Sequence, residues 1–282
     1  MTIRLRTLLG DHPCTAALKN GSVRSGLVGF DFAEYSPTNK GFKPMVREAA
    51  FDVCEMAIVT YLMAKSFNKP MVLLPSVVLA RFQHAYALTR AGEHFRPTAL
   101  NGKRVGIRSF TTTTGAWLRG ILANDYGVDL ASIDWVTFEE AHVAEFADHT
   151  KRAPAGKDII RMLLDGELDA VLGEKSDHAG LKPLFSDVGD EEKSWFSRQG
   201  VVPINHMVVV SHELARTHPE AVREVSSLLK ESAARAPASP RFSAEEMRRS
   251  LELIVRYSAQ QELIPRAYAV DELFDDLTRS LF

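Results

Sequence analysis

The chain has 282 residues, of which 45% are apolar and 25% are charged, and its formal net charge at pH 7 is −2. These values are those of a globular protein long enough for more than one domain, and they exclude a disordered or fibrous chain. The near-neutral balance offers no basic field for nucleic acid or for an anionic membrane, so any anion-binding patch has to be local. No apolar run reaches the roughly 18 residues of a membrane span.

The N-terminal segment and the cysteines indicate a cellular compartment. The opening MTIRLRTLLGDHP contains no apolar run of signal-peptide length, because polar residues return by Asp11. Cys14 and Cys54 have no CxxC spacing, which favours free thiols in a reducing compartment. We therefore expect a cytoplasmic protein. The sequence shows no HExxH, Cys/His cluster, Walker loop or GxGxxG, so it predicts no metal or nucleotide site of a familiar motif class.

The first hundred residues alternate between strand and helix patterns. Apolar alternation and short buried runs predict strands at 3–9, 27–35, 51–59, 71–74 and 85–89, and helical spacing predicts helices at 15–19 and 42–50. Glu55 interrupts the third strand, and the loop before the last strand contains Arg81 and His84. The first strand ends in a polar turn that contains Asp11 and His12.

A new unit begins near Leu100. Its predicted elements are strands at 103–107, 133–138 and 168–172, helices at 115–126 and 158–164, and a polar turn at 108–114. This β-turn-α-β succession is typical of a parallel sheet covered by helices. Residues 173–200 are polar and poorly periodic, 201–210 form a strand, and the remainder predicts helices at 219–235, 244–261 and 270–281 with a linker at 236–242.

The turn of the second unit is rich in hydroxyls. It reads Arg108, Ser109, Phe110, Thr111, Thr112, Thr113, Thr114, Gly115 between a strand and a helix. The N–H groups and positive dipole at a helix start, together with hydroxyls, suit a carboxylate. Plain helix capping needs only one Ser or Thr, so four consecutive threonines favour ligand contact. Clefts beyond strand ends are also the usual binding sites of open α/β sheets.

Several single residues are further candidates for chemistry. Glu55 lies in an apolar run, where a carboxylate is costly unless it is paired, protonated or at a cleft mouth; a structural salt bridge explains it equally well. Arg81 offers a planar fork for a carboxylate and His84 titrates near neutral pH, although either one alone reads as a surface side chain.

Three further residues in or next to predicted strands are candidates. His206 follows Pro-Ile-Asn in the strand at 201–210, where it is either a core histidine or a functional one. Asp11 and His12 end the first strand, where an ordinary turn explains them as well as ligand contact does. The methionines near these strands are interpreted as core.

Six segments together resemble the 4,5-dihydroxyphthalate decarboxylase family. They are FDVCEMAIVTYL (51–62), ARFQHAYAL (80–88), LNGKRVGI (100–107), GAWLRGILANDYGV (115–128), MLLDGELDAV (162–171) and VPINHMVVV (202–210). Taken singly, GELDA and NGKRVG are common among binding-protein relatives, whereas FDVCEM, WLRGIL before YGV, and PINH are more specific. The matches span most of residues 42–215.

The resemblance implies an α/β, two-lobed fold of the type II periplasmic-binding-protein kind, with ligand in a central cleft. It implies one lobe from residues 1–98 plus 205–282 and an inserted lobe from 99–204. It further implies decarboxylation of a hydroxylated aromatic dicarboxylate with no organic cofactor. The expected partner is therefore a small aromatic carboxylate, and neither nucleic acid nor a membrane is expected to bind. Association into a homo-oligomer stays an open alternative.

Roles for the candidate residues follow from that implied reaction. A carboxylate has to be clamped, for which we predict Arg81, Arg108 and Thr111 to Thr114, with Asp11 and His12 as further substrate contacts. A ring carbon has to be protonated by His206 or His84, while Glu55 orients a histidine or a substrate hydroxyl. The alternatives are a non-catalytic binding protein for a small aromatic carboxylate, and a lyase of the same scaffold acting on a different acid.

Overall fold

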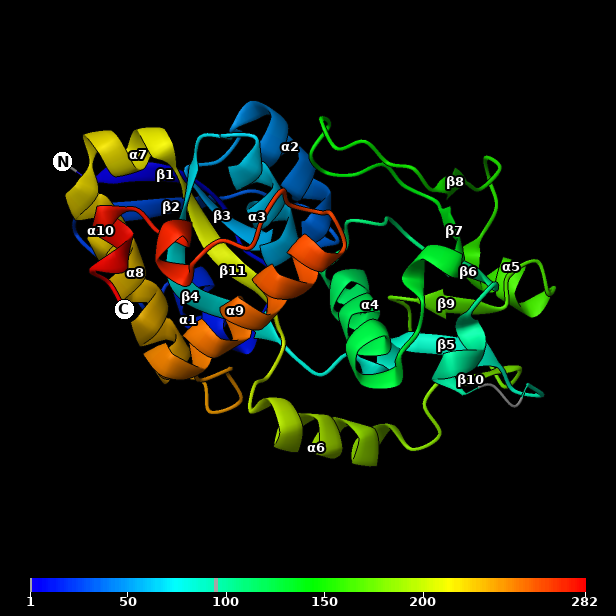
Figure 1. The fold of residues 1–282 in the computed structure, drawn as a ribbon. Helices are drawn as coiled ribbons and strands as arrows, with labels where there is room; N and C mark the ends of the chain where they lie inside the picture. Colours follow the sequence, from blue (N-terminus) through cyan, green and yellow to red (C-terminus); the bar gives the residue numbers. More distant parts are fainter. Residues whose placement is uncertain (1, 94–95) are drawn as a thin grey trace. The chain divides into compact units, whose positions relative to one another are not determined.

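The computed structural model describes residues 2–93 and 96–282, and it divides into two compact α/β units. The first unit contains Met1–Ala80, Ile204–Val255 and Ile264–Phe282. The second contains Arg81–Pro203 and Arg256–Leu263. The chain therefore leaves the first unit twice, after Ala80 and for a short stretch after Val255, and returns to it each time (Figure 1).

A five-stranded mixed sheet is the frame of the first unit. Its strands are, in spatial order, β2 (Val28–Phe32), β1 (Ile3–Leu8), β3 (Val53–Ala57), β11 (Ile204–Ser211) and β4 (Met71–Ala80). β1 is parallel to β2 and β3, whereas β11 is antiparallel to both β3 and β4. All five residues of β3 are buried, which explains why its sequence is an almost continuous apolar run.

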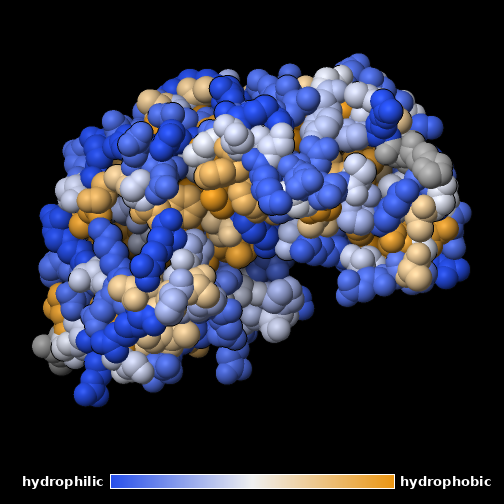
Figure 2. All heavy atoms as spheres, turned by 90° about the horizontal axis from the view of Figure 1, so that it is seen from below, coloured by the Kyte–Doolittle hydropathy of each residue, from blue (hydrophilic) through white to orange (hydrophobic). Residues whose placement is uncertain are grey.

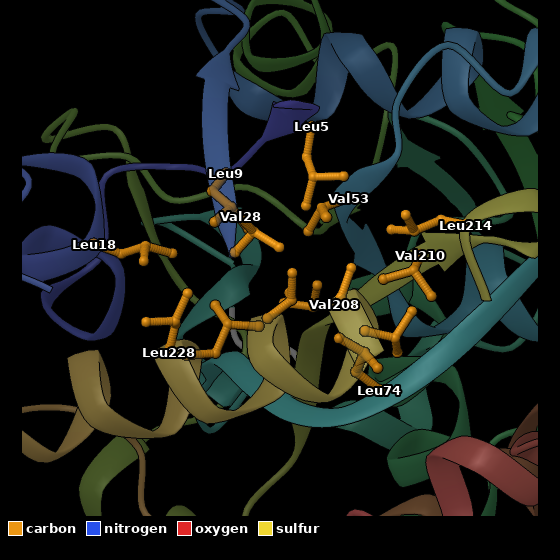
Figure 3. Packing of buried hydrophobic residues seen from close by; sticks show 14 of the residues in the cluster. Leu5, Leu9, Leu18, Val28, Val53, Leu74, Val208, Val210, Leu214 and Leu228 are labelled. Atoms are coloured by element: carbon orange, nitrogen blue, oxygen red, sulfur yellow. The ribbon is translucent and has the colours of Figure 1, made fainter. Parts of the chain in front are cut away.

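Helices of the first unit cover this sheet. They are α1 (Pro13–Lys19), α2 (Phe42–Glu48), α3 (Ile58–Ser66), α7 (His212–Thr217), α8 (Pro219–Ala234), α10 (Asp276–Arg279) and most of α9 (Ala244–Gln260). An apolar cluster joins β-strand residues such as Val53, Val208 and Val210 to Leu228 of α8, which Figure 3 shows packing against the strands. Burial of aliphatic side chains of this kind contributes about 1.5–3 kcal/mol for each residue.

The second unit contains a six-stranded sheet of its own. Its strands are, in spatial order, β10 (Leu181–Pro183), β5 (Ala87–Arg90), β9 (Ala170–Leu172), β6 (Arg104–Ile107), β7 (Asp134–Thr137) and β8 (Lys151–Arg152). β6, β7, β8 and β9 run parallel, and β5 is antiparallel to β9 and β10. The helices are α4 (Thr113–Tyr126), α5 (Ile159–Leu164) and α6 (Val188–Gln199), and two apolar clusters fill the space beside the sheet.

The structure differs from the sequence prediction at the boundary of the two units. Residues 81–98 were expected with the first 80, but β5 pairs with β9 and β10 in the sheet of the second unit. The pairing of β5 with β9 and β10 places this segment in the second unit, and such pairing cannot be read from the sequence. The end of α9, from Arg256, likewise belongs to the second unit.

Several helices and strands of the structure differ from those that the sequence predicts. Residues 58–66 form helix α3, whose first seven residues are buried, and periodicity cannot separate such a helix from a buried strand. β4 continues through Pro75 to Ala80 because it is an edge strand, where a missing N–H is tolerated at a register shift. Helix α6 lies in the segment that showed no clear period, and 270–281 forms two short helical pieces instead of one helix.

The surface and the cysteines agree with the composition. Figure 2 shows one face on which hydrophilic side chains predominate and apolar ones form separate patches. Cys14 and Cys54 are buried free thiols. Among residues 2–93 and 96–282, no helix is both long and apolar enough to cross a membrane.

Candidate active site

Three polar side chains of the first unit meet near the ends of inner strands of its sheet. Glu55 lies in β3, His206 near the start of β11, and His12 in the turn between β1 and α1. Leu8, the last residue of β1, pairs with Cys54, and His206 pairs with Ala57, so the turn after β1 and the start of β11 both lie beside the second half of β3. We call the set formed by His12, Glu55 and His206 the His-Glu-His cluster.

The carboxylate of Glu55 joins the two imidazoles. Its Oε1 lies 2.6 Å from His206 Nδ1 and 2.9 Å from His12 Nε2. Its Oε2 lies 3.0 Å from His12 Nε2 and accepts the backbone N–H of Gly10 at 2.8 Å. Both carboxylate oxygens are therefore satisfied, which a buried carboxylate requires.

Electrostatics keep Glu55 ionised. Its side chain is 1% exposed, and burial by itself raises the pKa of the carboxyl. The hydrogen bonds from His12 and His206 and their charge attraction outweigh that effect, so the pKa lies well below its usual range. The His12 and His206 side chains are 19% and 21% exposed, so each imidazole has one buried contact and some access to solvent.

Local packing fixes the cluster. The ring of Phe42 packs edge-on against His206, with centroids 5.3 Å apart and an interplanar angle of 81°. Gly10 has no Cβ, and a Cβ there would lie 2.8 Å from His12 Nε2 and 2.9 Å from Glu55 Oε2. The close approach of the turn to the carboxylate therefore depends on glycine at this position.

The cluster can also supply metal ligands. One ligand atom from each of His12, Glu55 and His206 lies within 4.8 Å of the others. Two imidazoles and one carboxylate are a donor set used for divalent transition metals. The short contacts are equally those of a hydrogen-bonded triad.

The predicted threonine turn is in the second unit, at the start of α4. Thr112 is the N-cap residue of α4, and the first helical hydrogen bond runs from Ala116 N to the Thr112 carbonyl at 2.9 Å. The Thr111 hydroxyl lies 3.1 Å from the Ser109 hydroxyl. Thr113 and Thr114 form the first helical residues. The order strand, turn, helix is as predicted, although the helix begins at Thr113 and not at Gly115, and contact of the turn with substrate stays a prediction.

The two arginines predicted to clamp substrate are also in the second unit. Arg81 stacks 4.1 Å from the ring centre of Tyr86, and its Nη2 lies 3.4 Å from the Thr114 hydroxyl. Arg108 forms an ion pair with Glu139 at 3.2 Å and is 35% exposed. Arg81 therefore lies at the threonine turn, whereas the charge of Arg108 is already shared with a carboxylate.

His84 belongs to the second unit. It is fully buried in the second unit, against Phe185 at 4.9 Å and Trp195 at 6.2 Å between ring centres. Neither ring nitrogen has a hydrogen-bond partner among the described residues. Burial lowers the pKa of His84 to about 4, so the ring is neutral near pH 7 and is poorly suited to donate a proton.

Asp11 and His12, predicted together, differ in their surroundings. Asp11 is 93% exposed and forms an ion pair with Lys19, whose ammonium lowers the pKa of the Asp11 carboxyl. His12 instead turns toward Glu55. This difference cannot be read from the sequence, because neighbouring turn residues can point in opposite directions.

Sequence reasoning missed Arg119 of α4. This arginine is 0% exposed although it carries a full charge, and it lies beside the threonine turn. A signal was present, because Arg119 interrupts the otherwise apolar AWLRGIL. A separate apolar cavity of about 480 Å³, bordered by α1, β4, α8 and α9, contains none of the predicted site residues.

Solved structures of one class of protein share the fold of this chain. The alkanesulfonate-binding protein SsuA of Xanthomonas axonopodis pv. citri is 14% identical with a TM-score of 0.58, and covers 97% of this chain and 98% of its own. The periplasmic aliphatic sulphonate-binding protein SsuA of Escherichia coli is 11% identical with a TM-score of 0.57, covering 98% and 92%. The chain thus has a periplasmic-binding-protein-like fold, as predicted.

The same fold occurs in an enzyme, and curated relatives add a particular resemblance. The desulfurization enzyme DszB has a TM-score of 0.53 at 13% identity, covering 99% of this chain and 98% of its own. A 4,5-dihydroxyphthalate decarboxylase of Comamonas testosteroni is 28% identical over 234 residues, which are 77% of this chain and 71% of the relative. One of Pseudomonas putida is 26% identical over 211 residues, covering 69% and 81%. No family model matches the chain. The resemblance to 4,5-dihydroxyphthalate decarboxylases is confirmed.

Proposed function

We propose that the protein is a decarboxylase of a hydroxylated aromatic dicarboxylate, of which 4,5-dihydroxyphthalate is the type. The observation that carries this proposal is the His-Glu-His cluster, in which a buried anion holds two partly exposed imidazoles. The names of the curated relatives support the substrate class.

The reaction requires a proton on the ring carbon that bears the departing carboxylate. The Nδ1 of His206 is held by Glu55, which leaves Nε2 as the atom that carries a transferable proton. The His206 imidazolium protonates the ring carbon, the bond to the carboxylate then breaks, and its electron pair restores the aromatic ring as CO2 leaves. The neutral imidazole finally regains its proton from solvent.

Glu55 acts on this step through His206. An anion beside Nδ1 fixes the ring orientation and stabilises the imidazolium before transfer. His12 shares the same carboxylate and stabilises it as an anion. General acid catalysis of this kind contributes about 10²–10⁴-fold to the rate.

The test is CO2 release by the purified protein from a panel of benzene and pyridine dicarboxylates with and without ring hydroxyls. We expect release from dicarboxylates with a hydroxyl para to a carboxylate, because that oxygen can supply electron density to the carbon being protonated. Each assay is run with and without a chelator, which separates proton transfer from metal-assisted chemistry. Absence of CO2 release from every hydroxylated member of the panel would contradict the proposal.

A second function fits the sulfonate-binding neighbours, whose structures align over 97–98% of this chain. It is reversible binding of a small aromatic carboxylate without turnover. The same panel separates the two functions, since a binding protein saturates with ligand that can be recovered unchanged.

A further inference from the structure

Arg119 in α4 is a buried cation whose hydrogen bonds are incomplete. Its Nη2 donates to the Phe110 carbonyl at 2.7 Å, and its Nε donates to Gln261 Oε1 at 2.8 Å. The guanidinium carbon lies 3.8 Å from the centre of the Phe110 ring and 5.6 Å from that of Trp135. Its Nη1 has no hydrogen-bond partner among the described residues.

No described carboxylate pairs with this cation. The acidic residue whose field reaches it is Asp148, but Asp148 accepts a hydrogen bond from Thr150 at 2.6 Å and lies 3.6 Å from Arg152. Burial lowers the pKa of Arg119 to about 9, which leaves the side chain charged at neutral pH. An unpaired buried charge is unfavourable, and contacts with two aromatic rings offset only part of that cost.

A second buried polar atom faces the same place. The Thr112 hydroxyl has no hydrogen-bond partner among the described residues. A Cβ on Gly115, in the first turn of α4, would lie 2.8 Å from this hydroxyl and 3.1 Å from Arg119 Nη1. Both atoms therefore point at the N-terminal turn of a helix of 14 residues.

Two positive groups lie together at the first turn of α4. The N-terminal end of α4 carries the positive end of the helix dipole, and Arg119 adds a full positive charge beside it. Two positive groups in contact with no anion repel each other, whereas an anion at the turn satisfies both. The Phe110 carbonyl, which would repel such an anion, is held by Arg119 Nη2.

We propose that Arg119 is the buried counter-charge that makes the turn 109–115 bind a carboxylate in preference to a neutral group of the same shape. Arg119 is a positioning residue, because it acts through the turn and through its field. Its bond to Gln261, whose amide donates to the Ala116 carbonyl at 2.8 Å, keeps the guanidinium under the first turn of the helix.

The experiment is calorimetric titration of the full chain with phthalate and with phthalamide, its neutral isostere. Wild-type protein, Arg119→Met and Arg119→Lys are compared. We expect wild type to prefer phthalate by about tenfold or more, and Arg119→Met to lose about tenfold in phthalate affinity with little change for phthalamide. Arg119→Lys, which keeps the charge, should retain most of the preference.

A measurement on wild type covers the case in which Arg119→Met does not fold. The guanidinium NMR signals of Arg119 should shift with phthalate and stay unchanged with phthalamide. Equal affinity of wild type for both ligands, no binding of either, or a parallel loss of both in Arg119→Met would overturn the proposal. The choice of phthalate as probe rests on the proposed function, but phthalate lacks the hydroxyls, so binding is measured without turnover. Failure of CO2 release from hydroxylated substrates is therefore a separate result.

Discussion

His206 and Glu55 are diagonal neighbours on adjacent antiparallel strands, and their side chains meet at 2.6 Å. Glu55 is paired in register with Val208, and His206 lies two residues away on the same face of β11. The pair is therefore set by backbone hydrogen bonding between β3 and β11, and its geometry is as rigid as the sheet.

Replacing His206 tests proton transfer directly. His206→Asn keeps the approximate size and one hydrogen bond to Glu55, but its amide cannot transfer a proton to the substrate. We expect turnover to fall about 10²–10⁴-fold with a much smaller change in substrate affinity. His218→Asn is the matched control, because His218 is an exposed histidine that pairs with Glu220 at 3.2 Å. Near-normal turnover of His206→Asn would place the proton donor elsewhere.

Replacing Glu55 tests the buried anion. Glu55→Gln leaves two imidazoles beside a neutral amide, and we expect the free energy of unfolding at pH 7 to fall by about 1.5–3 kcal/mol for each charge-assisted hydrogen bond that is lost. Turnover should also fall, because the imidazolium loses its stabilising charge. Urea unfolding and CO2 release measure the two effects, with Glu220→Gln as an exposed control. A fully stable and active Glu55→Gln protein would contradict the assigned role.

The same residue predicts a pH dependence of stability. The pKa of Glu55 is lower in the folded protein than in the unfolded chain, so the unfolded chain binds more protons between the two values. The stability contributed by Glu55 is therefore present above about pH 4.3 and is lost as the pH falls through the folded pKa. Glu55→Gln should lack this component of acid unfolding.

The turn before α1 should tolerate no side chain at Gly10. In Gly10→Ala the new Cβ lies 2.8 Å from the Thr38 hydroxyl and equally close to His12 Nε2, so the cluster has to shift. We expect turnover to fall about tenfold or more while the protein still folds, because displacing a catalytic group by a fraction of an ångström has effects of this size. Gly26→Ala is the control, since nothing lies within 4 Å of its new Cβ.

The threonine turn can be tested by a double substitution. Thr112 and Thr113 changed together to Val retain shape and remove both hydroxyls. Each lost hydrogen bond to a carboxylate should weaken ligand binding by about 1.5–3 kcal/mol, which calorimetry detects. Normal melting together with unchanged affinity would reduce this turn to a helix cap.

His84 predicts a different acid sensitivity. Burial lowers its pKa to about 4, below the value of about 6.5 for the unfolded chain, so the unfolded chain binds the proton first as the pH falls. Stability should decline between about pH 6.5 and pH 4, by on the order of 3 kcal/mol in total. His84→Phe should remove this decline and keep turnover. A large loss of turnover would instead support His84 as the proton donor.

Much of the fold could be predicted from the sequence because its signals are local. The strand at 3–9, the helix that starts near Thr113 and the amphipathic α8 all show their period or their capping residues directly. Helix α3 could not be predicted in the same way, because a segment buried on all sides has no polar face to reveal its period.

The same distinction between local and long-range features holds for the candidate site. That a carboxylate interrupts an apolar strand, that His12 follows the first strand and that His206 lies within a later one can be read along the chain, because residue type and apolar context are local properties. That Glu55 takes His206 and His12 as partners, and that His84 is buried among aromatic rings of the second unit, follows from the three-dimensional structure alone. Glu55 is 43 positions from His12 in the chain and 151 positions from His206. The three residues meet because of strand order and register, which are set by the packing of the whole sheet.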